Sequence, residues 1–150
     1  MTEDRAELIP YLCAKDAAAA MDFYKQAFGA KERERLPTPD GKIAHAEIEI
    51  GDSVLMLADP MSQSPFKSPK QIGGISGGLY VYVEDVDEVV QQVVDAGGTI
   101  GMPVETMFWG DRFGSVTDPF GHIWQIATRV EEVPPEEMAE RAKTAMASMS

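Results

Sequence analysis

Three segments of the chain space their apolar residues three and four positions apart, as one buried face of a helix requires. In DAAAAMDFYKQAFGA, Asp16 can cap the first turn and Gly29 can end the helix. The segment DVDEVVQQVVDAGG likewise begins at an aspartate and stops at a glycine. The C-terminal segment VPPEEMAERAKTAMASMS has its prolines and glutamates where helix starts favour them. The pattern therefore predicts three helices.

Other segments alternate apolar and polar residues or form short apolar runs, which predicts strands. They are ELIPYLCAK, AKERERL, LYVYVED and the irregular TIGMPVETMFWG. Two longer stretches predict hairpins, because KIAHAEIEIGDSVLMLAD turns at Gly51-Asp52 and GDRFGSVTDPFGHIWQIATR turns within DPFG. The segment PMSQSPFKSPKQIGGISGG shows no period, so we expect a linker or a mobile loop there.

The turn of the first hairpin fixes which of its side chains share a face. With Gly51 and Asp52 as the loop, the pairs are Ile50 with Ser53, Glu49 with Val54, Glu47 with Met56 and His45 with Ala58. One face is then purely apolar and must bury against a helix: Ala46, Ile48, Leu55 and Leu57. The other face is mixed and carries His45, Glu47, Glu49, Val54, Met56 and Ala58.

The order strand, helix, three strands occurs twice, and a shift of 69 positions, such as Asp16 to Asp85, aligns the copies. We predict one α+β domain, residues 1–150, with βαβββ modules at about 8–60 and 78–130. A linker at about 60–77 joins them, and a C-terminal helix follows at about 134–147. One module leaves a sheet face uncovered, so the two must pack into a curved mixed sheet around a trough. The shift places Gln125 on the trough face, where Met56 stands in the first module, and Trp124 in the core.

Composition narrows the classes of partner and compartment. The chain is 44% hydrophobic and 25% charged, as globular domains are. Its formal net charge of −12, with no Lys/Arg cluster, makes nucleic-acid and membrane partners unexpected. The single cysteine, Cys13, lies in an apolar run and is predicted to be a buried structural thiol. The N-terminus has no signal pattern and no apolar run is long enough to span a membrane, so we expect a cytoplasmic protein.

From about residue 8 to residue 130, the chain resembles the vicinal oxygen chelate superfamily. The resemblance rests on the paired modules and on two segments, DAAAAMDFYKQAFGA and GDRFGSVTDPFGHIWQIATR. This superfamily includes glyoxalase I, extradiol dioxygenases, fosfomycin-resistance enzymes and bleomycin-binding proteins. The motifs WGDR, TDPFGH.W.IAT and PEEM, the last at residues 135–138, are similar to those of its PhnB-like, glyoxalase-like subgroup. The resemblance implies the glyoxalase-like fold and common dimerisation, but it specifies no reaction.

In the metal-dependent members, the resemblance implies four ligands from the first and last strands of each module, of the kinds His or Gln, Glu, His and Glu. Carried over to this chain, the positions hold Ile9, Met56, Gly78 and Gln125. Ile and Gly have no side-chain donor, and the Met thioether suits copper rather than the harder divalent ions. One amide cannot offset the dehydration of a divalent ion. We therefore expect no metal site of the family type and no cofactor.

A displaced site is the alternative for the first module. His45 and Glu47 share a strand face and Glu49 follows two positions later, so they could form a partial ligand cluster on the trough wall. The same residues could equally form a solvated, hydrogen-bonded wall of charges. His45 and Glu47 are also the weak candidates for a general base. His122 has the opposite strand parity to Gln125, which favours a role in packing the turn.

In the second module, Trp109 lies in a loop, where it could stack on a planar ligand or anchor the loop on the core. Arg112 is expected near Ala127 on the trough side. There its guanidinium could bind a carboxylate or phosphate, or pair with Asp111, Glu47 or Asp118. The sequence DPFG at 118–121 is typical of a turn and is not expected to take part in catalysis.

These features favour a binding module that holds a small organic molecule in the trough between the modules. The expected contacts are Trp109, Arg112, Gln125, Met56, His45 and Glu47. The alternative is an enzyme of the same superfamily, a lyase, isomerase or dioxygenase-like protein, metal-independent or with a non-standard metal site. A weak apolar stripe on the last helix, Met138, Ala142, Ala145 and Met149, could cover the core edge or a partner subunit. We expect a homodimer.

Overall fold

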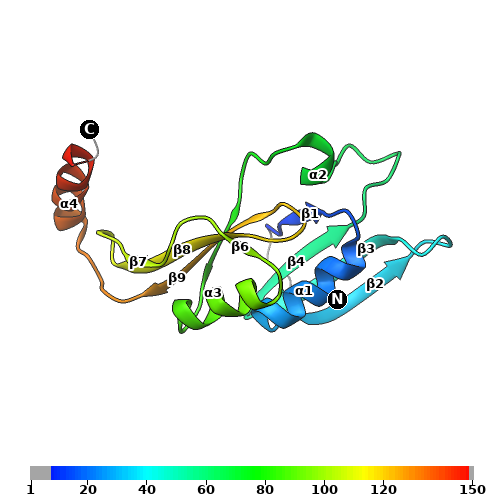
Figure 1. Cartoon of the computed structure of the whole chain (residues 1–150), viewed down its shortest axis with the longest axis horizontal. Helices are drawn as coiled ribbons and strands as arrows, with labels where there is room; N and C mark the ends of the chain where they lie inside the picture. The colour runs from blue at the N-terminus through cyan, green and yellow to red at the C-terminus, as the bar shows by residue number, and fades with distance from the viewer. Residues whose placement is uncertain (1–7, 149–150) are drawn as a thin grey trace.

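A computed structural model describes residues 8–148 of the chain. The first module has the predicted order of strand, helix and three strands, whereas the second has four strands after its helix (Figure 1). The first comprises β1 (Tyr11–Cys13), α1 (Ala17–Phe28), β2 (Lys31–Pro37), β3 (Ile43–Ile50) and β4 (Ser53–Ala58). The second comprises β5 (Leu79–Tyr82), α3 (Val86–Asp95), β6 (Thr99–Ile100), β7 (Glu105–Thr106), β8 (Asp111–Thr117) and β9 (Ile123–Arg129). The last helix, α4, spans Pro135–Ala147.

The two sheets share one topology. The strand order is β1-β4-β3-β2 in the first and β5-β9-β8-β6 in the second, with β7 also paired to β8. In each sheet the first strand runs parallel to the last strand of its module, and the hairpin is antiparallel. The sheets lie along the long axis of an elongated molecule, and α4 stands at the end remote from the first module (Figure 1). The predicted mixed α+β fold is confirmed.

The hydrophobic core runs through both modules. Helices α1 and α3 contact each other and cover the apolar faces of the two sheets. The four first-hairpin residues predicted to face a helix are at most 4% exposed: Ala46, Ile48, Leu55 and Leu57. Trp124 is 2% exposed, as its predicted core position requires. The observed pairs Ile50–Ser53, Glu49–Val54 and Glu47–Met56 confirm the predicted register.

The motif around 118–124 joins the modules rather than forming a site. Asp118 accepts hydrogen bonds from Tyr24 Oη on α1 at 2.5 Å and from Trp124 Nε1 at 3.0 Å. His122 Nε2 donates to the carbonyl oxygen of Cys13 at 2.9 Å. His122 is therefore a packing residue, as its strand parity predicts. Cys13 is buried, and burial raises the pKa of its thiol, as expected of a structural cysteine.

The segment predicted as a linker or mobile loop is more ordered than its composition indicates. It contains a short helix, α2 (Pro69–Ile72). Ser68 caps this helix from a fully buried position, and the Gln71 side-chain oxygen accepts a hydrogen bond from the backbone N–H of Ser68. The ring of Phe66 stacks on Tyr11 with centroids 5.7 Å apart. A capping box and an aromatic contact thus fix a stretch in which no hydrophobic period exists.

Helix α4 forms as predicted, with Pro135 and two glutamates in its first turn. None of its described residues is fully buried. Its half-buried side includes Met138, Ala142 and Ala145 of the predicted stripe, whereas Met149 lies outside the described residues. Arg141 ties the helix to the second module by hydrogen bonds to the Phe108 carbonyl oxygen and to Glu131. Among the described helices, none is long and apolar enough to cross a membrane.

Candidate functional site

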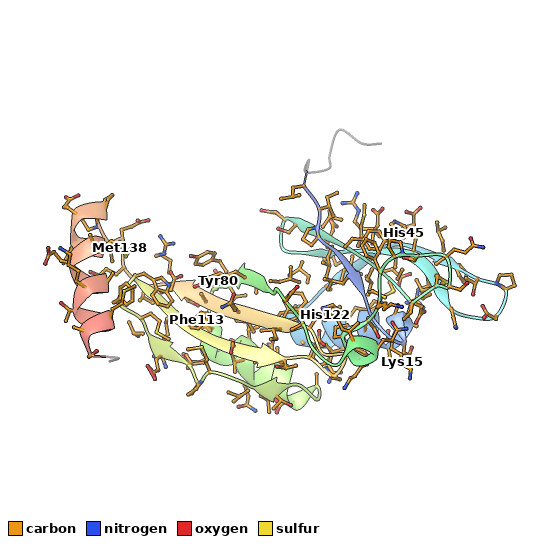
Figure 2. All side chains as sticks on the ribbon, turned by 90° about the horizontal axis from the view of Figure 1, so that it is seen from above. Lys15, His45, Tyr80, Phe113, His122 and Met138 are labelled. Carbon is orange, nitrogen blue, oxygen red and sulfur yellow. The ribbon has the colours of Figure 1, made fainter. Side chains whose placement is uncertain are left out.

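Six side chains predicted to contact a ligand do not come together in this chain. His45, Glu47 and Met56 belong to the first sheet, whereas Trp109 and Gln125 belong to the second module. Figure 2 shows His45 on one half of the molecule, and Tyr80 and Phe113 on the other. A hollow of about 220 Å³ does lie between the modules, lined mainly by apolar residues such as Leu8, Ile50, Val54 and Leu79. None of the six predicted residues lines it.

Arg112 is on the opposite side of the sheet from the one predicted. Its backbone pairs with Thr128 rather than Ala127, because the turn between β8 and β9 holds five residues, 118–122. Asp118 stabilises this longer turn by accepting the N–H groups of Phe120 and His122. The Arg112 guanidinium therefore reaches α3, where Nε donates to Asp87 at 2.8 Å. The salt bridge that the sequence offered as an alternative exists, but with Asp87 instead of the three predicted partners.

The one-residue difference in register places Asp111 on the sheet face that Arg112 was expected to occupy. The Asp111 side chain is fully buried and accepts four hydrogen bonds. Tyr80 Oη donates at 2.7 Å, Tyr82 Oη at 2.9 Å, Trp109 Nε1 at 3.1 Å and Arg129 Nε at 2.8 Å. Burial opposes ionisation of Asp111, but these donors together lower the pKa of its carboxyl group below the usual value.

We call this surface the Asp111 face and define it by Tyr80, Tyr82, Trp109, Asp111, Phe113 and Arg129. The Tyr80 ring stacks on Phe113 at 5.7 Å, and Trp109 meets Phe113 edge-on at 5.8 Å. The Arg129 guanidinium lies 5.4 Å from the Tyr82 ring centroid and also donates to Tyr82 Oη. Tyr80, Tyr82 and the Arg129 side chain remain 42%, 52% and 46% exposed. Fixed aromatic rings and a guanidinium are thus presented to the outside.

Of the predicted contacts, Trp109 belongs to the Asp111 face and Gln125 lies beside it. Gln125 pairs with Tyr80 on β5 and with Ser115 on β8. Sequence reasoning missed Asp111, Tyr80, Tyr82 and Arg129 as a group. One signal was available, because the 69-residue shift aligns Tyr80 with Tyr11 and each of them stands beside an expected trough residue, Gln125 or Met56.

The first sheet carries a second polar cluster. His45 Nε2 lies 3.0 Å from Glu47 Oε2, and His45 Nδ1 lies 2.8 Å from Tyr11 Oη. Glu34, on the neighbouring strand β2, brings Oε1 to 3.9 Å from His45 Nε2. Glu49, the third residue expected in this cluster, instead pairs with Arg33 at 3.6 Å. Among residues 8–148, Glu34, His45 and Glu47 form the group whose ligand atoms all lie within 4.8 Å of one another.

The positions that hold the metal in family members are arranged as the repeat requires. Met56 pairs with Tyr11 across β1 and β4, and the Met56 N–H donates to the Pro10 carbonyl oxygen. Gly78 lies just before β5, where an added Cβ would approach the Ile123 carbonyl oxygen to 2.9 Å. A side chain longer than glycine therefore requires a local shift at that position. The expectation of no family-type metal site stays a prediction.

Comparisons with known proteins place this geometry in a family. The sequence model of the Glyoxalase/Bleomycin resistance protein/Dioxygenase superfamily matches residues 6–126. An uncharacterised protein of Mycobacterium bovis is 41% identical over 134 residues, covering 87% of this chain and 88% of the relative.

Solved structures agree with the fold. A gene product of Arabidopsis thaliana has a TM-score of 0.67 at 28% identity, covering 81% of this chain and 98% of that chain. The PhnB protein from Bacillus cereus has a TM-score of 0.65 at 22% identity, covering 82% and 99% of the two chains. The likeness to the Bacillus cereus protein shows the fold alone. The match to the family model confirms the resemblance that was drawn from the sequence motifs.

Proposed function

The chain belongs to the glyoxalase/bleomycin resistance protein/dioxygenase superfamily, and from that premise we propose that it binds a small organic molecule against the Asp111 face of its second sheet. The observation that carries the proposal is the anchoring of four partly exposed side chains by one buried carboxylate. Anchored rings and a fixed guanidinium lose little conformational entropy when a ligand binds.

The chemistry of the face indicates the class of ligand. Tyr80, Tyr82 and Trp109 offer flat apolar surfaces with polar edges. The Arg129 guanidinium is paired with Asp111 and lies 3.5 Å from Glu132, but it is half-exposed and has further N–H groups to donate. A planar aromatic molecule that carries a carboxylate would satisfy both features. Gln125, next to Tyr80 in the sheet, can add an amide hydrogen bond. Arg112 takes no part, because its guanidinium pairs with Asp87 on α3.

A second copy of the chain would complete this site. The Asp111 face is an open sheet surface, whereas small-molecule sites are concave and bury most of their ligand. Helix α4, at the same end of the molecule, has no fully buried residue among those described and keeps a half-buried apolar side. The homodimer and the cytoplasmic location both stay predictions.

Tryptophan fluorescence can test the binding proposal, because Trp109 is on the face and Trp124 is in the core. We would titrate naphthoate, salicylate and benzoate and record both emission and thermal midpoint. Quenching is expected in the wild-type protein, with the optical signal lost in Trp109→Phe. Affinity should fall at least tenfold in Tyr80→Ala.

Arg112→Ala is the matched control, because it removes a guanidinium from the same sheet, on the side opposite the Asp111 face. It should bind the probes like the wild type. Equal weakening in Arg112→Ala and Tyr80→Ala would contradict the proposal. So would a panel in which no aromatic acid changes either the emission or the thermal midpoint.

One observation favours the enzyme alternative. His45 contacts Glu47 through one ring nitrogen and Tyr11 through the other, so its imidazole is oriented as a general base requires. Such an enzyme would exchange an acidic C–H of a carbonyl substrate with deuterium from D₂O. The exchange, followed by NMR, should disappear in His45→Ala. No exchange with any of a broad set of carbonyl compounds would argue against the alternative.

A further inference from the structure

The cluster on the first sheet joins three potential metal ligands from two strands. Glu34 lies on β2, and His45 and Glu47 lie on β3. The register pairs Glu34 directly with Glu47, so two carboxylates stand side by side with the imidazole next to them. Like charges opposite one another in a sheet are destabilising unless something offsets them. A divalent cation would neutralise both carboxylates.

Burial in the cluster is graded from the sheet outward. The Glu47 side chain is 3% exposed, His45 24% and Glu34 44%. The innermost carboxylate is therefore held by its surroundings, and the outermost is free to adjust. The solvent side remains open, which would leave coordination positions for water or for an oxygen of a bound molecule. Catalytic and ligand-binding metal centres share that arrangement.

Tyr11 fixes the orientation of the imidazole. Its hydroxyl lies 2.8 Å from His45 Nδ1, which directs Nε2 toward the two carboxylates. Metal-binding histidines generally engage the second ring nitrogen in such a hydrogen bond. Tyr11 is itself held by the stacked Phe66 ring of the 60–78 segment. The supporting contact expected around a metal ligand is thus in place.

We propose that Glu34, His45 and Glu47 bind a divalent first-row transition-metal ion, at a place different from the family's four ligand positions. The donor set of one imidazole and two carboxylates suits Zn²⁺ or Mn²⁺. In a tetrahedral zinc site, neighbouring donors are about 3.3 Å apart. The two distances from His45 Nε2, 3.0 Å to Glu47 and 3.9 Å to Glu34, require only a small movement of exposed Glu34.

This site is independent of ligand binding at the Asp111 face, since the two clusters belong to different sheets. Neither proposal requires the other. Loss of metal binding with retained binding of aromatic acids would count against the metal site alone. Metal binding without any binding of aromatic acids would count against the organic ligand alone.

Equilibrium dialysis of untagged protein against Zn²⁺, and separately against Mn²⁺, is the direct test. We expect one ion per chain, with affinity reduced at least tenfold in His45→Ala and in Glu47→Gln. Tyr11→Phe should weaken binding about tenfold, the usual effect of losing a supporting hydrogen bond. Glu49→Gln is the matched control, because Glu49 lies on the same strand face but pairs with Arg33. Gln125→Ala is a second control: Gln125 stands at one of the family's four ligand positions, so its loss should leave metal affinity unchanged.

The proposal predicts a change in the His45 tautomer, which the wild-type protein can report without any substitution. Without a cation, Nε2–H can donate to Glu47 while Nδ1 accepts from Tyr11. With a cation on Nε2, the proton must be on Nδ1. The chain has two histidines, and His122 Nε2 donates to the Cys13 carbonyl oxygen, so it serves as an internal reference.

Zn²⁺ should shift the ¹⁵N signals of His45 to the Nδ1–H pattern and leave those of His122 unchanged. An unchanged His45 tautomer at millimolar Zn²⁺ would overturn the proposal. Binding that survives both His45→Ala and Glu47→Gln, or that falls equally in Glu49→Gln, would also overturn it. Circular dichroism of each variant confirms that the comparison is between folded proteins.

Discussion

At the scale of single residues, Asp111 shows how one carboxylate can organise a surface. It is fully buried, yet it is ionised, because two phenols, an indole and a guanidinium all donate to it. Arg112, the next residue, faces the other side of the sheet and pairs with exposed Asp87. The contribution of a charged side chain therefore depends on which of two adjacent strand positions it occupies.

We predict that Asp111→Asn destabilises the protein by about 3 kcal/mol, since it leaves buried donors without their charged acceptor. Asp87→Asn removes the acceptor of an exposed pair and should have a much smaller effect. Urea unfolding of the two variants at pH 7 measures the difference. Equal losses would show that the Asp111 cluster adds nothing to stability beyond a surface pair.

The same residue gives a prediction about pH. The pKa of Asp111 is lower in the folded protein than in the unfolded chain, where it is about 4. The stability it contributes is therefore complete above that value and is lost as the pH falls through the folded pKa. The difference in unfolding free energy between wild type and Asp111→Asn should shrink below about pH 4.

On the alkaline side, burial and the hydrogen bond to Asp111 raise the pKa of Tyr80 to about 12. Because this value is above that of an unfolded tyrosine, about 10, the Tyr80 contribution is present below pH 10 and lost above it. The difference in unfolding free energy between wild type and Asp111→Asn should thus be constant between about pH 5 and pH 9. A difference that grows with acid would contradict the assigned direction.

At the scale of elements, the repeat extends to how each main helix begins. Asp59 Oδ1 accepts the N–H groups of Asp16 and Ala17 at the start of α1, and Oδ2 accepts the N–H of Ile43. Thr128, 69 positions later, accepts the N–H of Val86 at the start of α3. Each helix is therefore held by the end of the last strand of its own module.

We expect Asp59→Ala to cost about 3 kcal/mol and Thr128→Val about 1 kcal/mol, because the first leaves three N–H groups without an acceptor and the second leaves one. Urea unfolding measures both. A larger loss in Thr128→Val than in Asp59→Ala would contradict this account of the two helix starts.

At the scale of the whole molecule, the chain is elongated, with its polar clusters on separate sheets and α4 at one end (Figures 1 and 2). The sequence-based picture of one trough between the two modules of a chain is incomplete, because the predicted contacts do not converge there. A second copy that covers the Asp111 face would supply the missing wall.

The homodimer can be tested by light scattering, which should give twice the 16.4 kDa chain mass. Ala142→Glu places a charge on the half-buried side of α4 and should shift the protein toward monomer. Ala139→Glu places the same charge on the exposed side and should not. A monomer mass for the wild-type protein, or equal dissociation by both variants, would contradict α4 as part of the interface.

The sequence by itself determined the three longer helices, the repeat, the family and the apolar and mixed faces of the first hairpin, whereas the short helix α2 was not predicted. These follow from local periodicity and from a two-residue turn whose register can be counted, as Glu47–Met56 shows. Only the structure settled the side of Arg112, because the turn between β8 and β9 comprises the five residues 118–122. Asp118 holds that turn through the N–H groups of Phe120 and His122, and it also accepts a hydrogen bond from Tyr24, far along the chain.

Long-range pairing also decided what the mixed faces contain. Glu34 reaches His45 and Glu47 only because β2 pairs with β3 in a bulged register, and Tyr80 reaches Asp111 only through the sheet between them. A single sequence shows which residues can face outward. The folded chain shows which of them meet, because those contacts come from strand pairing and packing that no local pattern encodes.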